Sequence, residues 1–229
     1  MTTGTKTKIE RIGEAERRYV AQVLDTNFRT ASGAKMCNNL ERAFADRFSV
    51  GYAISFVNGT STMHAALVAA GVGPGDEVIV PPLTMASTTF VVLQAGAVQV
   101  FADVDPDTFQ IDAASVAELV TKRTKAIIPV ALYGLSPDMD ALMDIAERHE
   151  LTVIEDDAET MFSTWKGKLV GTLGHMASFS FQSTKHLTSG EGGMLITNDG
   201  ELARKVRQFN SLGYAGLDGG KGKITKDDI

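Results

Sequence analysis

One lysine of this sequence lies in a setting that suits covalent chemistry. Lys185 follows the apolar run Ala177–Phe181 and precedes the glycine-rich segment Gly190–Gly193, which leads into another apolar run. An amine held between two buried strands loses its water, and desolvation lowers the pKa of an amine and makes it nucleophilic. The alternative is an ordinary surface lysine, because lysine is seldom buried. The local sequence alone favours that alternative.

A cluster of acidic residues follows a second apolar run. Glu155, Asp156, Asp157 and Glu159 come directly after Val153 and Ile154. In an open α/β sheet, ligands bind at the carboxyl ends of the strands, so a carboxylate here is placed to meet one. A solvated or helix-capping cluster explains the same residues equally well.

A third candidate site lies where an apolar run turns into a helix. The turn Asn58-Gly59-Thr60-Ser61 places two hydroxyl side chains at the expected start of that helix. Helix N-termini bind phosphate, because free N–H groups and the positive end of the helix dipole point outward there. Threonine and serine are also common helix caps, so this segment alone is weak support for a phosphate site.

The elements that must position these residues form an alternating pattern. Short Val/Ile-rich runs alternate with amphipathic segments from about Gly51 onward, which is typical of a mostly parallel sheet covered by helices on both faces. We therefore predict an α/β fold with three layers and a seven-stranded sheet. The expected strands are Ala53–Val57, Glu77–Val80, Val98–Asp103, Ala126–Ala131, Thr152–Glu155, Ala177–Phe181 and Met194–Thr197. The expected helices between and after them are Thr60–Ala70, Ala86–Ala95, Ala113–Thr121, Met139–His149 and Glu201–Leu212.

Residues 1–50 differ from this pattern. Two helices are expected there, over Ile9–Asp25 and Asn39–Arg47, with a looser segment between them that is a candidate entrance loop. Near the other end, Asn198 and Glu201 have the spacing of a capping box, and Gly213 has the position of a helix C-terminal glycine.

Composition excludes several classes of protein. The chain has 22 Lys plus Arg and 28 Asp plus Glu, a net charge of −6, and no basic block, which argues against a nucleic-acid or anionic-lipid partner. The longest apolar runs fall far short of the roughly 20 residues of a membrane helix. A single cysteine, Cys37, suits a reducing cytoplasm. The four histidines show no paired spacing for a metal, so we expect no metal.

Several ordered motifs together resemble those of the DegT/DnrJ/StrS aminotransferases, which are pyridoxal-phosphate enzymes that aminate keto-sugars. The resemblance runs from about Ile9 to the end of the sequence. It is carried by Asn58–Ser61, Gly73–Pro81, Phe101–Pro106, Tyr133-Gly134, Glu155-Asp156, Phe179–Phe181 with Lys185, and Gly190–Gly193.

The resemblance assigns roles to single residues. It implies that Lys185 forms the Schiff base with pyridoxal 5'-phosphate and later moves a proton between the substrate carbon and the cofactor. Asp156 is implied to keep the pyridine nitrogen protonated, which keeps the ring an electron sink. The implied phosphate ligands are Thr60, Ser61 and Ser180, with Gly59 beside them in the cofactor site.

Two positions depart from the family pattern. Glu159 stands where the family often has glutamine, near the ring hydroxyl of the cofactor, and an ionised glutamate there would repel the phenolate oxygen. We expect it to be protonated, paired with a neighbour or turned toward the substrate. Met85 stands where many relatives stack an aromatic residue on the ring, and its thioether covers the ring with less area.

The resemblance also implies a whole function. The enzyme would transfer an amino group from an amino acid, L-glutamate, to a nucleotide-linked keto-sugar in amino-sugar and polysaccharide biosynthesis, as a cytoplasmic homodimer. Residues 1–229 correspond to the large cofactor domain, because relatives continue into a small C-terminal domain. Relatives that deoxygenate sugars replace the lysine with histidine, so Lys185 favours transamination. The alternative is a truncated, non-catalytic cofactor-binding relative, or a subunit that needs a partner chain.

Overall fold

The computed structural model describes residues 11–26, 28 and 35–213, and these form parts of two compact units, Met1–Leu40 and Glu41–Ile229. In the first unit, α1 (Glu14–Asp25) buries none of its side chains. The helix begins at Glu14, later than expected, with Gly13 as its N-cap. Residues 11–13 are not helical. The expected helix start at Ile9 and the candidate entrance loop around residues 30–33 lie outside the described residues.

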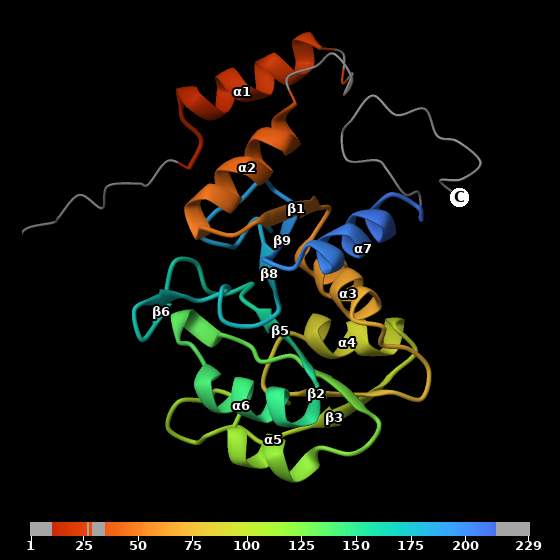
Figure 1. Ribbon diagram of the computed structural model, residues 1–229. Coiled ribbons are helices and arrows are strands. Elements are labelled where there is room, and N and C mark those ends of the chain that lie inside the picture. The colour runs from red at the N-terminus through yellow and green to blue at the C-terminus, as the bar shows by residue number, and fades with distance from the viewer. Residues whose placement is uncertain (1–10, 27, 29–34, 214–229) are drawn as a thin grey trace, which may run out of the picture. The chain divides into compact units, whose positions relative to one another are not determined.

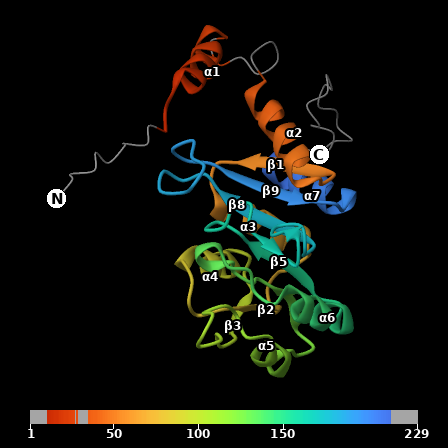
Figure 2. The same cartoon turned by 90° about the vertical axis from the view of Figure 1, so that its left-hand side faces the viewer.

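The second unit is built on one seven-stranded sheet (Figure 1). The strands follow one another in the order β1-β9-β8-β5-β4-β2-β3, and Figure 2 shows this succession for the strands that it labels. The strands from β8 to β3 pair in parallel, whereas β9 pairs antiparallel with both β1 and β8. The strands are β1 (Tyr52–Phe56), β2 (Glu77–Val80), β3 (Val98–Phe101), β4 (Thr124–Ile127), β5 (Thr152–Asp156), β8 (Met176–Ser180) and β9 (Gly193–Thr197).

Helices cover both faces of this sheet and give the three expected layers (Figure 1). One face carries α3 (Gly59–Ala69), α4 (Ala86–Gln94) and α7 (Gly200–Asn210). The other carries α5 (Ala113–Leu119) and α6 (Met139–His149). The strands in the middle of the sheet are apolar on both faces, as strands covered on both sides must be.

Aromatic packing holds the β8–β9 region of the sheet. Phe44 and Phe48 of α2 (Met36–Phe48) stack on each other with ring centroids 4.7 Å apart, and Phe48 lies 5.0 Å from the buried Phe179 of β8. Each buried aromatic ring of this kind contributes about 2 to 3 kcal/mol of burial energy. The strand that leads to Lys185 is therefore firmly anchored.

The structure differs from the expected elements in detail. Strand β4 ends at Ile127 rather than Ala131, because Pro129 has no N–H to donate to the ladder, although Val130 still bridges to Asp156. The expected capping box at Asn198 is wrong by one residue. Asp199 caps α7 by accepting from the N–H groups of Glu201 and Leu202, and Asn198 accepts from Gly51 N–H instead.

Three further elements were not anticipated. A short hairpin joins β6 (Thr164–Trp165) to β7 (Lys168–Leu169), and Leu132–Gly134 forms a single 3₁₀ turn. Strands of two residues are too short to produce a visible alternation in sequence. No helix within the described ranges is long and apolar enough to span a membrane, and no group of His, Cys, Asp or Glu side chains there is arranged to hold a metal ion.

Candidate functional site

Lys185 lies in the connection between β8 and β9, where hydrogen bonds hold its backbone. Its N–H donates to the Gln182 carbonyl at 2.9 Å, and Gln182 Oε1 accepts from both the N–H and the hydroxyl of Thr184 at 2.8 and 2.7 Å. A bridge between Gln182 and Gly190 closes the base of the loop. The Lys185 side chain is only 19% exposed, so it is not an ordinary surface lysine.

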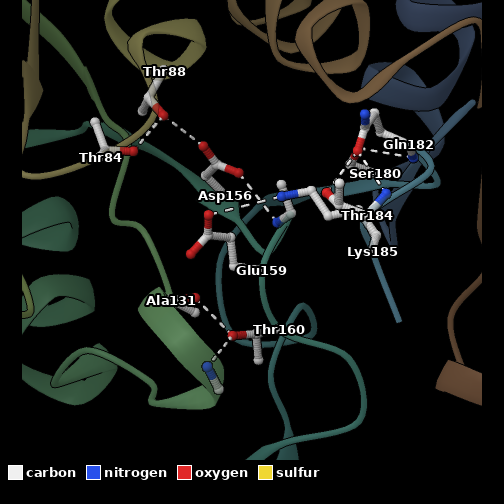
Figure 3. Close-up of polar contacts among 12 residues, drawn as sticks. Thr84, Thr88, Ala131, Asp156, Glu159, Thr160, Ser180, Gln182, Thr184 and Lys185 are labelled. Atoms are coloured by element: carbon white, nitrogen blue, oxygen red, sulfur yellow. Dashed lines mark hydrogen bonds and ion pairs between the residues drawn. The ribbon is translucent and has the colours of Figure 1, made fainter. Parts of the chain in front are cut away.

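Two carboxylates that follow β5 lie near this amine (Figure 3). Lys185 Nζ is 3.8 Å from Glu159 Oε1, so Glu159 has a neighbour with which it can pair. The second oxygen, Glu159 Oε2, is buried and has no hydrogen-bond partner among the described residues. A buried acceptor without a donor costs free energy, so this atom is a place where a bound group would find an unused partner.

Asp156 is almost fully buried at the end of β5. Its Oδ2 accepts a hydrogen bond from Thr88 Oγ1 at 2.7 Å and its Oδ1 accepts one from Ala158 N–H at 3.2 Å. Burial raises the pKa of Asp156, while the Thr88 hydroxyl, the Ala158 N–H and then the charge of Lys185 act to lower this pKa. Burial has the larger effect, so the pKa of Asp156 lies above its usual value, and the two hydrogen bonds and Lys185 favour the charged form against this burial.

Thr88 and Thr84 were missed as site residues by sequence reasoning. Thr84 Oγ1 lies 2.8 Å from Thr88 Oγ1, so the two hydroxyls form a chain that ends on Asp156 (Figure 3). Their spacing of four residues across the start of α4, just after the carboxyl end of β2, was the available signal.

A second cluster surrounds the N-terminus of α3. Asn58 caps the helix by accepting from Ser61 N–H at 2.8 Å, and the half-buried Thr60 and Ser61 side chains make no hydrogen bond within the described residues. Their hydroxyls and the first N–H groups of the helix are therefore available to an anion.

The end of β8 packs directly against this helix start. A Cβ at Gly59 would lie 3.1 Å from Ser180 Cβ, and a Cβ at Gly193 would lie 2.5 Å from the Asn58 carbonyl. Only glycine permits so close an approach. Below the surface, Thr62 and Ser178 share a 2.5 Å hydrogen bond that joins the two elements. Ser180 is thus brought beside Gly59, which directly precedes Thr60 and Ser61.

Met85 remains outside both clusters. It precedes α4 as its N-cap and is 63% exposed, so nothing in the described part of the chain covers most of its side chain. Its neighbour Thr84 is the outer member of the hydroxyl chain to Asp156, which places Met85 at the edge of the same region.

The two acids on either side of Asp156 have a different environment. Glu155 is buried and accepts three backbone hydrogen bonds, from Gly171, Leu173 and Gly174 at 2.6 to 2.8 Å. Asp157 is equally buried, but its Oδ2 has no partner among the described residues. Burial, and then the charges of Glu155 and Asp156, raise the pKa of Asp157 well above its usual value.

The loop after β4 is tied to the site through Thr160. The Thr160 hydroxyl donates to the Ala131 carbonyl at 2.6 Å and accepts from Gly134 N–H at 3.1 Å (Figure 3). Between these two contacts Tyr133 adopts a left-handed backbone conformation with φ of 51° and is 90% exposed. An exposed aromatic side chain is therefore held in a costly conformation next to the site.

The arrangement has the donors and acceptors that pyridoxal phosphate requires. An anion site of hydroxyls lies at a helix N-terminus, a buried carboxylate lies beside a half-buried amine, and Glu159 offers an unpartnered oxygen. An α/β/α fold with a free helix N-terminus and a half-buried lysine at the ends of its strands is of the class that binds small ligands at the carboxyl ends of the strands.

Comparison with known proteins identifies the family. The chain belongs to the DegT/DnrJ/EryC1/StrS aminotransferase family, whose model matches residues 10–226. A GDP-perosamine synthase from Caulobacter vibrioides is 48% identical over 203 residues, which are 89% of this chain and 54% of that protein. The chain spans about half the length of the curated relatives that it matches.

Solved structures agree in fold. An aminotransferase from Psychrobacter cryohalolentis is 37% identical with a TM-score of 0.86, and the match covers 94% of this chain and 55% of that one. A sugar aminotransferase described as putative, from Streptococcus pneumoniae in its PLP-form, is 28% identical with a TM-score of 0.81, covering 94% and 59% of the two chains. The predicted fold class and family are therefore confirmed.

Proposed function

We propose that this chain is the large cofactor domain of a pyridoxal-phosphate-dependent aminotransferase of amino-sugar biosynthesis. The acceptor is a nucleotide-linked keto-sugar, and the donor is an amino acid, L-glutamate. The observation that carries the proposal is the half-buried Lys185 amine, 3.8 Å from Glu159 and electrostatically coupled to the buried Asp156. The relatedness to a GDP-perosamine synthase supports the sugar acceptor.

When bound, pyridoxal phosphate supplies an aldehyde for covalent attachment and a ring that withdraws electrons from the reacting carbon. Lys185 Nζ would provide the amine for that attachment, and its neutral form would afterwards accept a proton from the substrate carbon and return it, with Glu159 nearby to stabilise the ammonium form. Asp156 keeps a proton on the ring nitrogen, because a buried anion strongly favours a cation beside it.

The remaining site residues bind and orient. Thr60, Ser61 and Ser180 bind the phosphate together with the N–H groups at Gly59 and the start of α3. Glu159 would lie near the ring hydroxyl, where its unpartnered Oε2 would accept a hydrogen bond from that hydroxyl. The exposed Met85 side chain would cover one face of the ring and become less exposed.

The test is covalent trapping at Lys185. The purified chain is mixed with pyridoxal phosphate and reduced with borohydride, and the modified peptide is located by mass spectrometry. The expected result is one adduct at Lys185 that is absent from Lys185→Ala and unchanged in Lys168→Ala, since Lys168 is exposed on β7. Equal labelling of many lysines, or no adduct in a folded sample, would overturn the proposal.

We also propose that the enzyme is a cytoplasmic homodimer. A single cysteine, Cys37, and a mildly acidic composition suit a reducing compartment. Exposed apolar side chains near the site, Leu83, Met85, Tyr133 and Leu187, support burial against a second copy. Light scattering on the cofactor-loaded protein would measure twice the mass of the monomer, and a monomeric mass at high concentration would contradict this.

A further inference from the structure

We propose that Thr88 and Thr84 are positioning residues that hold the Asp156 carboxylate charged and aimed at the ring nitrogen of the cofactor. This inference rests on the proposed function and deepens it, because it concerns the group that stabilises the protonated ring. The hydroxyl chain that carries it is visible in Figure 3 and belongs to α4 and the segment before it.

The direction of the two hydrogen bonds follows from counting protons. A threonine hydroxyl has one hydrogen, and an ionised carboxylate can only accept. Thr88 therefore donates its hydrogen to Asp156 Oδ2, and Thr84 must donate to Thr88. Two aligned donors polarise each other, so the chain stabilises negative charge on Asp156 more than one hydroxyl alone.

The chain also fixes the orientation of the carboxylate. Thr88 engages Oδ2 on the α4 side, while Oδ1 accepts only the longer bond from Ala158 N–H. Oδ1 lies on the side of Lys185 in Figure 3. The oxygen with spare capacity is thus directed toward the amine that would carry the cofactor.

The charges around Asp156 leave a specific task for the hydroxyls. Lys185 favours its charged form and Glu159 opposes it, and the adjacent Asp157 is also an acid. Neither α4 nor β8 contains an ionisable side chain, and the single one on α3, His64, makes an edge-to-face contact with Phe209 instead. Hydrogen bonding from α4 is therefore the main local counterweight to the burial of this carboxylate.

Burial predicts that loss of the Thr88 hydroxyl will weaken cofactor binding more than loss of the Thr84 hydroxyl. Thr88 is fully buried, so water cannot replace its hydroxyl, whereas Thr84 is only half-buried and water can substitute there. Loss of the Thr88 hydroxyl should weaken cofactor binding by about tenfold, and loss of the Thr84 hydroxyl by about threefold.

The experiment compares Thr88→Val, Thr88→Ser and Thr84→Val with Thr89→Val. Valine keeps the shape of threonine without the hydroxyl, serine keeps the hydroxyl, and Thr89 is the next residue on α4 with its hydroxyl bonded to its own helix. In cofactor-free protein, carboxyl-carbon NMR follows the titration of Asp156, assigned by comparison with Asp156→Asn. In a second measurement, pyridoxal phosphate affinity is determined as the pH is lowered.

The expected result is that Thr88→Val moves the Asp156 titration to higher pH and loses affinity most at low pH. Thr88→Ser restores both, Thr84→Val shows a smaller shift, and Thr89→Val shows none. An unchanged titration in folded Thr88→Val, or a failure of serine to restore it, would overturn the inference. If Thr88→Val does not fold, the Thr84→Val titration decides in the same way.

The experiment distinguishes failure of the proposed function from failure of the inference about Thr88 and Thr84. If the unmodified protein does not bind pyridoxal phosphate, the proposed function fails, while the Asp156 titration still reports whether the hydroxyl chain controls its charge. A Thr88→Val protein that is less stable but titrates normally would assign Thr88 a purely structural role and reject the inference.

Discussion

The two sides of the sheet at the end of β5 handle buried carboxylates in different ways. Successive residues of a strand point to opposite faces, so Asp156 lies on one side and Glu155 and Asp157 on the other. On the Asp156 side, the Thr88 hydroxyl and the Lys185 amine favour a negative charge on Asp156, and Lys185 and Glu159 are partly exposed to solvent. On the other side, Glu155 is closed off by three N–H groups and Asp157 has an oxygen without a partner.

This difference means that the carboxylates on one side of the sheet serve ligand binding and those on the other side serve the stability of the fold. Carboxylates of one short segment are equally buried, yet only the one that faces Lys185 has neighbours that a cofactor can share. The Glu155 side serves the fold, because its partners are backbone groups of the loop at residues 171–174. Substitutions on the two sides should therefore change different measured quantities.

The largest effect on stability is expected for Glu155→Ala. Three backbone N–H groups lose their acceptor, and the free energy of unfolding should fall by about 3 kcal/mol. Urea unfolding of this variant is compared with Glu147→Ala, an exposed glutamate of α6 that should change stability little. Equal stability of the two variants would contradict the assignment of Glu155 to the fold.

The next effect is on activity and belongs to Asp156→Asn. Without the carboxylate, the ring nitrogen loses its charge partner, and the transamination rate should fall by about a hundredfold. Stability should not fall, because the substitution removes a desolvated charge. Stopped-flow absorbance measures the half-reaction with glutamate. A normal rate would remove Asp156 from the site.

Asp157→Asn is the matched change on the opposite side. The raised pKa of Asp157 means that the fold favours its protonated form. The contribution of Asp157 to stability is therefore fully present below its unfolded pKa and is lost as pH rises through its folded pKa. The variant lacks this decline and should gain about 1 kcal/mol over wild type at alkaline pH, with unchanged activity. Parallel stability curves from about pH 5 to pH 8 would reject this explanation.

The smallest effect concerns His175, which precedes β8. Its Nδ1 accepts from Val153 N–H at 3.0 Å, and burial lowers its pKa, although Asp199 acts in the opposite direction. Its stability contribution is present above the unfolded pKa of about 6.5 and is lost as pH falls. Because the ring is largely exposed, the loss should be about 0.5 kcal/mol or less. Wild type and His175→Ala should differ less at pH 5 than at about pH 8 in thermal unfolding.

Much of the fold was predictable because its pattern is local. Six apolar runs gave strands within one or two residues of the expected ends, while β4 ended early at a position that depends on Pro129. The roles of Lys185 and Asp156 were predicted from family motifs, because the neighbouring residues in the sequence do not show that these two side chains are buried or that they lie close together. The Thr84–Thr88 chain escaped prediction because its meaning depends on Asp156, which is distant in sequence and meets it only in the folded sheet.

The pairing of β1 with β9 has a consequence for how the protein is made. Phe56 lies opposite Gly193 in this pair, and the start of α3 meets Ser180 and Gly193 at the same junction. The ribosome releases the turn before α3 early, but β8 and β9, which pack against it, are synthesised more than a hundred residues later, so this junction can form only late. Binding of the cofactor to the nascent chain would then occur only after β9 has paired with β1 and β8.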